Sequence, residues 1–240
     1  MARLSERMHS AVETLKDILY PAGTNCLVCG DYPGNRLICR DCLDALEGCR
    51  IREPRCENCG GPLEGRLCPR CVSGWRIPGT SLWSHRDAAR KLVEQLKFNR
   101  VELAAEAMGP MLAKEAERLR LPEDTVVTWV PMRPDRLKRR GIDHAGELAE
   151  QTARAMNLRC DCLLDNMSPE SAKAGGQVHR GREERISRDL RYVAKGVMPA
   201  HVLLVDDVMT TGATCLAAAS ALLAGGAEVR FLTATRTPKY

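Results

Sequence analysis

Two adjacent carboxylates followed by a run of small residues are the chemically most specific part of the sequence. Asp206 and Asp207 directly follow the apolar run 202–205, and the small residues 210–214 lead into a segment rich in Ala and Leu. This order predicts a buried strand, a sharp turn and a helix. Amide N–H groups at a helix N-terminus bind phosphate, and Gly212 permits close approach. Since paired carboxylates accept hydrogen bonds from adjacent hydroxyls, the stretch predicts a site for a phosphorylated sugar.

The same stretch resembles the phosphoribosyl pyrophosphate (PRPP) motif of type I phosphoribosyltransferases: a hydrophobic run, Asp-Asp, two further residues and Thr-Thr-Gly-x-Thr. The resemblance implies that Asp206 and Asp207 bind the ribose and that Mg²⁺ binds together with PRPP. Thr210 stands where enzymes of the hypoxanthine type place an aspartate, and a threonine does no acid–base work near neutral pH. This argues against hypoxanthine–guanine activity. The residues implied to hold the 5′-phosphate are Thr210, Thr211, Gly212, Ala213 and Thr214.

Eight of the twelve cysteines fall into four Cys-x-x-Cys pairs. Two residues between thiolates let a tight turn place both on one metal, so eight ligands predict two structural Zn²⁺ sites of four cysteines each. The pairs combine either sequentially or in an interleaved cross-brace. The predicted ligands are Cys26, Cys29, Cys39, Cys42, Cys56, Cys59, Cys68 and Cys71. The remaining four, Cys49, Cys160, Cys162 and Cys215, lack ligand spacing and are expected to pack in the interior.

The N-terminal residues bear on the redox environment of these thiols. Residues 1–20 carry charges throughout and lack the continuous apolar region of a signal peptide. We therefore expect a cytoplasmic protein, in which metal binding is favoured over disulfides. No apolar run approaches the roughly 20 residues that span a bilayer, so no membrane span is expected.

The chain of 240 residues divides into three predicted parts: an amphipathic helix at 1–25, a zinc-binding module at 26–74 and an α/β domain at 81–240. In the last part strand and helix patterns alternate, which predicts a mainly parallel sheet with ligands at the carboxyl ends of its strands. Strands are expected at 81–85, 125–130, 160–164, 202–205 and 228–233, and helices at 87–98, 101–119, 145–156 and 215–224.

The formal net charge of +5 is distributed unevenly. Residues 1–80 hold 11 Lys and Arg against 10 Asp and Glu, so residues 81–240 carry +4 of the total. Eight thiolates and two zinc dications together add −4, which leaves the metallated N-terminal third near −3. General attraction for polyanions is therefore expected in the C-terminal domain. A further candidate is a local basic patch in the zinc module, formed by Arg50, Arg52, Arg55, Arg66 and Arg70.

Two polar segments of this domain are further candidate sites. Residues 131–141 follow an expected strand and hold five basic residues against one acid. Such a strand-end loop suits a pyrophosphate, as the resemblance also implies, and the alternative is a solvated basic turn. Residues 166–190 are polar without apolar periodicity, which is typical of a lid or of a loop without function. The pyrophosphate candidates are Arg133, Arg136 and Arg140, and the candidates in a flexible hood over PRPP are Gln177, Arg182 and Arg185.

Taken together, four features resemble the ComF family of competence-associated, phosphoribosyltransferase-like proteins. These are the Cys-x-x-Cys pairs, Leu-Lys-Phe at 96–98, the Pro-rich basic segment and the PRPP motif. Where the family typically reads Arg-Gly-Phe-Asn-Gln-Ala, residues 140–145 read Arg-Gly-Ile-Asp-His-Ala. The resemblance implies a type I phosphoribosyltransferase-like fold and PRPP binding. It also implies handling of incoming single-stranded DNA, with a competence helicase or other DNA-processing proteins as partners.

Two other functions remain open from the sequence: a transferase acting on a small acceptor, and a non-catalytic module that senses PRPP. No catalytic residue is identified, and the titrating candidates near the motif are His144 and His179. Trp75 and Trp83 either stack on nucleobases or belong to the core.

Overall fold

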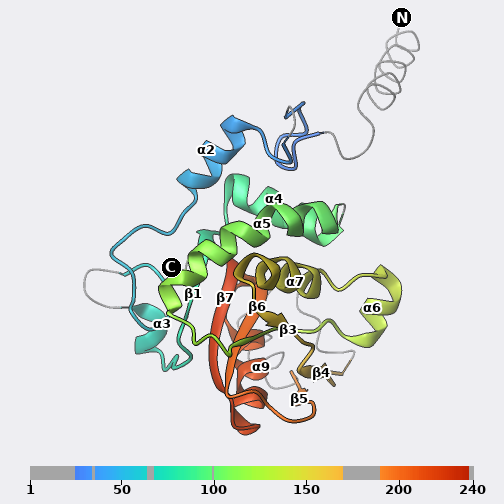
Figure 1. Ribbon diagram of the computed structural model, residues 1–240. Helices are drawn as coiled ribbons and strands as arrows, with labels where there is room; N and C mark the ends of the chain where they lie inside the picture. Colours follow the sequence, from blue (N-terminus) through green and yellow to red (C-terminus); the bar gives the residue numbers. More distant parts are fainter. Residues whose placement is uncertain (1–24, 34–35, 64–67, 99, 170–189, 238–240) are drawn as a thin grey trace, which may run out of the picture.

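The computed structural model describes residues 25–33, 36–63, 68–98, 100–169 and 190–237 (Figure 1). Its centre is a five-stranded sheet in which every neighbouring pair is parallel, in the order β1-β7-β6-β2-β3. The prediction of a mainly parallel α/β sheet is thereby confirmed. The strands are β1 (Gly79–Ser84), β2 (Val126–Trp129), β3 (Arg159–Cys160), β6 (His201–Met209) and β7 (Glu228–Arg236).

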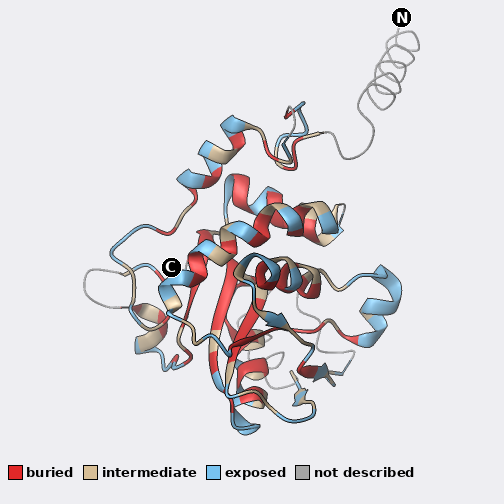
Figure 2. Ribbon diagram, in the orientation of Figure 1, coloured by how far each residue is buried: buried red, intermediate tan, exposed pale blue. Residues whose placement is uncertain are grey.

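Helices cover both faces of this sheet, which is why its central strands are buried along most of their length (Figure 2). One core contains α4 (Asp87–Phe98), α5 (Val101–Ala116) and α7 (His144–Met156), and a short 3₁₀ turn, η1 (Glu117–Leu119), follows α5. The second core contains α9 (Ala213–Ala224) and the small antiparallel sheet of β4 (Leu164–Asn166) and β5 (Tyr192–Ala194).

The lengths of the strands around β6 create an opening at one edge of the sheet. β2 pairs with β6 only as far as Trp129 opposite Val205, whereas β7 continues to pair with β6 as far as Met209. Beyond Val205 the β2 side of β6 is therefore free of a strand. The acidic pair, Asp206 and Asp207, lies in this overhang, at the carboxyl end where ligands bind in open parallel sheets.

Three expected elements differ most in the structure, and the strand expected at 228–233 also extends, as β7, to Arg236. The strand expected at 160–164 is wrong: β3 ends at Cys160, and β4 belongs to another sheet. The N–H of Leu163 is donated to the side-chain hydroxyl of Thr128 on β2 and not to a backbone carbonyl, so the ladder does not continue there. The strand expected at 202–205 extends to Met209, since β7 keeps pairing with it. The loop expected at 131–141 contains a helix, α6 (Pro134–Arg140), whose N-terminus begins with a proline and whose end is a left-handed Gly141.

The cysteine-rich region contributes two short helices, α2 (Arg40–Gly48) and α3 (Pro69–Val72). Leu27, Ile38 and Leu46 join the core of α4 and α5, while Cys59 and Cys68 join the core of α9. The predicted helix at 1–25 lies almost wholly outside the described residues, as do Gln177, His179, Arg182 and Arg185. The boundaries of the three parts stay predictions. Within the described ranges, no helix combines the length and the apolar character needed to cross a membrane.

Candidate ligand cleft and zinc centres

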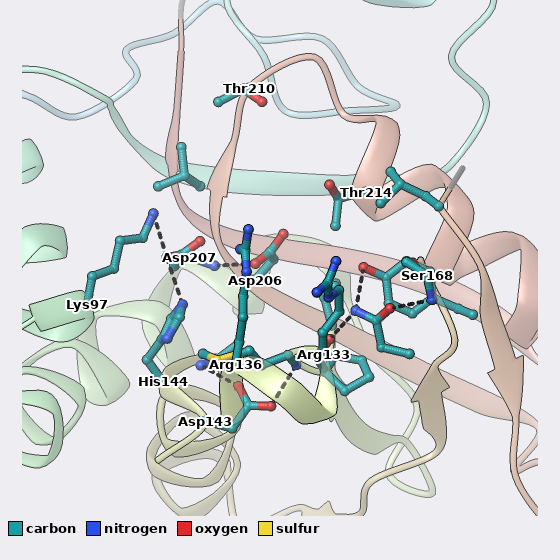
Figure 3. Close-up of a pocket in the computed structure, with 18 of the residues that line it drawn as sticks. Lys97, Arg133, Arg136, Asp143, His144, Ser168, Asp206, Asp207, Thr210 and Thr214 are labelled. Carbon is teal, nitrogen blue, oxygen red and sulfur yellow. Dashed lines mark hydrogen bonds and ion pairs between the residues drawn. The ribbon is translucent and has the colours of Figure 1, made fainter. Parts of the chain in front are cut away.

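A cleft of about 620 Å³ opens at the carboxyl ends of β2 and β6 (Figure 3). It brings together the three groups of residues that the sequence predicts to bind PRPP and that fall within the described residues. These are the acidic pair, the phosphate loop (residues 210–214) and the three arginines at 133, 136 and 140. Other elements also contribute lining residues: Lys97 and Phe98 at the end of α4, His144 at the start of α7 and Tyr192 on β5.

The two carboxylates of the acidic pair have different surroundings because successive strand residues point to opposite faces. Asp207 is buried and faces α4 and α7, with its Oδ2 atom 2.8 Å from Lys97 Nζ and 3.5 Å from His144 Nε2. Figure 3 shows both of these side chains pointing toward Asp207. Asp206 instead accepts a hydrogen bond of 2.9 Å from the N–H of Asp207 and interacts electrostatically with Tyr192 on β5.

These surroundings shift the two pKa values in opposite directions. Burial raises the pKa of Asp206 well above its usual value, and the neighbouring charge of Asp207 raises it further. Burial also acts to raise the pKa of Asp207, but the Lys97 ammonium, the His144 side chain and the hydrogen bonds to the carboxylate together outweigh burial, and the net shift is downward. Burial lowers the pKa of His144, so its imidazole is neutral near pH 7. The negative charge of Asp207 is therefore compensated by Lys97, whereas the charge of an ionised Asp206 is not compensated by a neighbouring cation.

The phosphate loop turns sharply before α9. Gly212 is the N-cap of this helix at φ 87°, a left-handed conformation that favours glycine. The Thr211 hydroxyl accepts a hydrogen bond of 3.3 Å from the N–H of Ala213, and Thr214 lines the cleft. The first turn of a 12-residue helix thus faces the cleft with small side chains, the arrangement that suits an anion.

The three predicted arginines are not equivalent. Arg133 is buried, donates to both carboxylate oxygens of Asp135 at 2.9 and 2.6 Å, and donates to the carbonyl oxygen of Pro169 at 2.6 Å. The Arg133 guanidinium lowers the pKa of Asp135 to about 2. Arg136 lines the cleft without a carboxylate partner among the described residues. Arg140 is exposed, with its guanidinium 5.3 Å from the centre of the Phe98 ring.

Asp143 fixes the geometry of this side of the cleft. Its Oδ1 atom accepts from the N–H groups of Ala145 and Gly146 and so caps α7. Its Oδ2 atom accepts from the Met132 N–H at 2.8 Å and from the Trp129 indole at 3.2 Å. Asp143 stands where the family pattern has an asparagine, and its side-chain oxygens supply the acceptors that this position requires.

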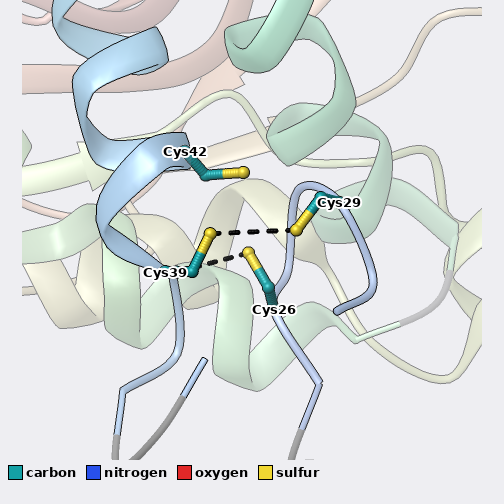
Figure 4. A group of neighbouring side chains, drawn as sticks. All are labelled: Cys26, Cys29, Cys39 and Cys42. Carbon is teal, nitrogen blue, oxygen red and sulfur yellow. Dashed lines mark hydrogen bonds between the residues drawn. The ribbon is translucent and has the colours of Figure 1, made fainter. Parts of the chain in front are cut away.

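The eight predicted cysteines gather in two sequential groups, and within each group the sulfur atoms all lie within 4.8 Å of one another. Figure 4 shows the first group, in which the Cys26 sulfur accepts hydrogen bonds from the N–H groups of Val28 and Cys39 at 3.4 Å. Four thiols at this separation fit a tetrahedral Zn²⁺ ion. We call these groups the first ribbon (Cys26, Cys29, Cys39 and Cys42) and the second ribbon (Cys56, Cys59, Cys68 and Cys71).

A cationic side chain supports the second ribbon. Arg236 at the end of β7 donates to the Cys59 carbonyl oxygen at 2.6 Å and to the Cys59 sulfur at 3.5 Å. Burial acts to raise the pKa of the Cys59 thiol, but the Arg236 charge and the hydrogen bonds prevail and lower it to about 7. This favours the thiolate form that binds metal.

Several other predictions are corrected. The described arginines of the zinc module do not form the expected basic patch: Arg50 pairs with Glu47 at 2.7 Å, Arg55 pairs with Glu115 at 2.6 Å, and Arg70 is buried. Arg66 lies outside the described residues. Of the four remaining cysteines, Cys49 and Cys215 are buried, but Cys162 is exposed and its sulfur lies 3.3 Å from Lys195 Nζ. Both Trp75 and Trp83 are buried, so they belong to the core and offer no surface for base stacking.

Comparisons with known proteins agree with this arrangement. A family model for the double zinc ribbon domain matches residues 15–72, which with the two thiol groups confirms the two structural zinc sites. Competence protein ComFC of Streptococcus pneumoniae is 25% identical over 183 residues, 74% of this chain and 77% of that protein. DNA utilization protein YhgH of Escherichia coli K12 is 30% identical over 204 residues, 79% of this chain and 86% of that protein. The chain belongs to the ComF family.

One solved structure similar to this ComF-family chain is glutamine PRPP amidotransferase from B. subtilis in complex with ADP and GMP. It matches with a TM-score of 0.36 and 22% sequence identity, covering 55% of this chain and 26% of that chain.

Sequence reasoning misses one residue that lines the cleft of this ComF-family protein and one that lies behind its phosphate loop. Lys97 lines the cleft, and in the sequence it belongs only to the Leu-Lys-Phe resemblance, although a basic residue in the last turn of a helix is a recognisable signal. Arg70 is expected in a surface patch, yet it donates to the carbonyl oxygens of Thr210 and Thr211. No local pattern indicates either contact, because each joins residues more than 100 positions apart.

Proposed function

We propose that this ComF-family protein binds PRPP with Mg²⁺ in the cleft and takes part in handling incoming single-stranded DNA during natural competence, in the cytoplasm. One observation carries the proposal: the acidic pair and the phosphate loop line one cleft together with Arg136 and Arg140. These groups match the ribose hydroxyls, the 5′-phosphate and the diphosphate of one molecule. The DNA role is supported by relatives named a competence protein and a DNA utilization protein.

In this proposal each part of PRPP meets a group of suitable charge. The 5′-phosphate lies at the first turn of α9, where the helix dipole and free amides favour an anion. Asp206 and Asp207 accept hydrogen bonds from the ribose hydroxyls, which compensate the charge of Asp206. Arg136 and Arg140 receive the diphosphate through charge-assisted hydrogen bonds. Magnesium prefers carboxylate and phosphate oxygens, both of which this complex supplies.

Calorimetry with PRPP and Mg²⁺ tests the proposal. Asp206→Asn combined with Asp207→Asn should weaken PRPP binding about a hundredfold or more, since each charged hydrogen bond contributes roughly 1.5–3 kcal/mol. The matched control is Glu123→Gln with Asp124→Asn. This exposed acidic pair precedes β2, at the opposite ends of the strands, and its removal should leave the affinity unchanged. Equal binding by the cleft variant and wild type would contradict the proposal.

A second candidate function is transfer of the phosphoribosyl group to a small acceptor. The observation that favours it is the His144 imidazole, neutral near pH 7 and 3.5 Å from Asp207. In such a step the acceptor forms a bond to C1 of PRPP, the C1–O bond to pyrophosphate breaks, and His144 takes the proton of the acceptor. Pyrophosphate release with a panel of nucleobases and amines measures it. PRPP binding with no release favours a non-catalytic PRPP sensor.

A further inference from the structure

The second ribbon contacts the phosphate loop through one side chain, Arg70. This residue lies on α3, between the ligands Cys68 and Cys71, and is buried. Its Nη2 atom donates to the carbonyl oxygen of Thr210 at 2.8 Å, and its Nη1 atom donates to that of Thr211 at 2.5 Å. A residue inside a metal-binding turn thus binds the backbone of the loop that precedes α9.

These two hydrogen bonds determine which way the loop amides point. In a trans peptide the N–H group points away from the carbonyl of the same unit. When Arg70 holds the carbonyls of Thr210 and Thr211 toward the ribbon, the N–H groups of Thr211 and Gly212 point to the other side. Thr210 and Thr211 line the cleft, so that side is where a phosphate would bind. The guanidinium also brings positive charge behind the loop and neutralises carbonyl oxygens that would repel an anion.

Packing leaves Arg70 and the loop little freedom. A Cβ atom on Gly212 would lie 2.6 Å from Arg70 Nη1 and 2.8 Å from the Trp75 ring, so only glycine fits between them. The Trp75 ring lies 5.6 Å from the Arg70 guanidinium carbon, and its indole N–H donates to the Ile77 carbonyl oxygen at 2.6 Å. Trp75 also meets Phe231 of β7 edge to face. Movement of α3 would therefore be transmitted to the loop.

The first ribbon has no equivalent contact among the described residues. It joins the core of α4 and α5, on the other face of the sheet from α9. Hydrogen bonds connect the region around it to the domain, from Arg100 to the Asn25 carbonyl oxygen at 2.7 Å and from Arg86 to the Gly48 carbonyl oxygen at 2.8 Å, and neither of them involves the phosphate loop. The two zinc sites therefore differ in one respect that can be measured, and the first serves as an internal control for the second.

We propose that Arg70 is a positioning residue that couples zinc binding at the second ribbon to phosphate binding at the loop. The inference rests on the proposed function, because it takes the loop as the site of the PRPP 5′-phosphate. Zinc holds α3 in place, α3 holds Arg70, and Arg70 orients the amides. Coupling between two sites is reciprocal, so PRPP must also strengthen zinc retention at the second ribbon.

The test measures the zinc affinity of the full-length protein by equilibrium competition with a chromogenic chelator, with and without PRPP and Mg²⁺. PRPP should raise the affinity for one of the two zinc ions by roughly 5- to 150-fold, the usual range of coupling between two sites. Alkylation of released thiols followed by peptide mass spectrometry should place the protection at Cys56, Cys59, Cys68 and Cys71, with no effect on the first ribbon.

Variants then assign the coupling to Arg70. Arg70→Ala should weaken PRPP binding and abolish the effect of PRPP on zinc affinity, while Arg70→Lys should restore part of both. The matched control is Arg76→Ala, an exposed arginine that donates to the Cys71 carbonyl oxygen and does not reach the loop. It should keep the coupling intact.

The outcomes separate this inference from the proposed function. A wild-type protein that binds no PRPP overturns both. A wild-type protein that binds PRPP but holds both zinc ions with unchanged affinity overturns the coupling alone. Equal protection of the two ribbons also overturns it, because that result would reflect general stabilisation. The wild-type measurement decides the question even if Arg70→Ala fails to fold.

Discussion

The ammonium of Lys97 lies 2.8 Å from Oδ2 of Asp207, and this ion pair distinguishes two adjacent carboxylates that look alike in the sequence. Lys97 belongs to α4 and Asp207 to β6, so the pair connects a helix to the overhanging end of the central strand. Asp206 has no cationic partner at such a distance among the described residues. The two aspartates should therefore contribute to stability with opposite signs.

Asp207→Asn should lower the free energy of unfolding at pH 7 by about 1.5–3 kcal/mol, the contribution of a charged hydrogen bond. The folded-state pKa of Asp207 is lowered, so its stabilisation is fully present above the ordinary aspartate pKa of about 4 and is lost as the pH falls through the folded value. Urea unfolding of wild type and variant at several pH values checks this. A destabilisation that persists unchanged in strong acid would point to packing rather than charge.

Asp206→Asn should have the opposite effect and raise the free energy of unfolding at pH 7. The folded-state pKa of Asp206 is raised, so the folded protein holds this proton more tightly than the unfolded chain, and stability falls as the pH rises above about 4. The asparagine removes this cost. The gain should vanish in strong acid and should accompany weaker PRPP binding. A less stable Asp206→Asn protein at pH 7 would contradict the assignment of the uncompensated charge.

Local patterns predicted the elements better than the contacts between them. The bounds of α4 follow from its apolar spacing, and the acidic pair and phosphate loop follow from their order along the chain. The sequence also contains a signal for the helix α6, because Pro134 is typical of a helix start and Gly141 of a helix end. The many basic residues between them favour the interpretation as a loop instead. The contacts of Lys97 with Asp207 and of Arg70 with Thr211 depend on how distant elements pack. Spacing along the sequence does not encode that packing.

The purified protein should contain two zinc ions per chain, and their removal should destabilise more than the cysteine-rich region. A structural zinc site contributes on the order of 10 kcal/mol. Because Leu27 and Leu46 pack with α4 and Cys59 packs with α9, chelation should loosen both cores. Elemental analysis gives the zinc content, and hydrogen exchange should increase first in residues 26–71 and then in α4. Folded protein without zinc would contradict the prediction.

His144 provides a pH test of the transferase alternative. Because burial lowers its pKa below the usual value of 6.5, the imidazole stays neutral at pH 7 and becomes protonated only in more acidic solution. Any pyrophosphate release that uses His144 as a base should therefore be constant around pH 7 and fall below pH 6.5. His144→Asn should reduce that release by roughly 100-fold or more. Release that is unaffected by the substitution would remove His144 from the mechanism.

Single-stranded DNA should bind at the mouth of the cleft. Because Trp75 and Trp83 are buried, we expect Phe98 to be the aromatic ring on which a base stacks. Phe98 is 66% exposed, Arg140 lies close to its ring, and Arg136 also lines the cleft. We expect micromolar affinity that falls steeply with salt, by a slope of roughly −0.7 for each phosphate contacted. Phe98→Ala should weaken binding by about 1–3 kcal/mol, the contribution of one stacked base, and leave the salt slope unchanged.

Arg136→Ala combined with Arg140→Ala should instead flatten the slope by about 1.4, because two phosphate contacts are lost. It should also weaken PRPP binding, since the diphosphate uses the same two guanidinium groups, and PRPP should compete with DNA. The control is Arg159→Ala, an exposed arginine on the edge strand β3 that is paired with Asp161 and does not line the cleft. Fluorescence anisotropy over a series of salt concentrations measures all three proteins. If DNA binds all of them with equal slopes while PRPP binding falls only in the double variant, the cleft serves the sugar phosphate alone and DNA binds elsewhere.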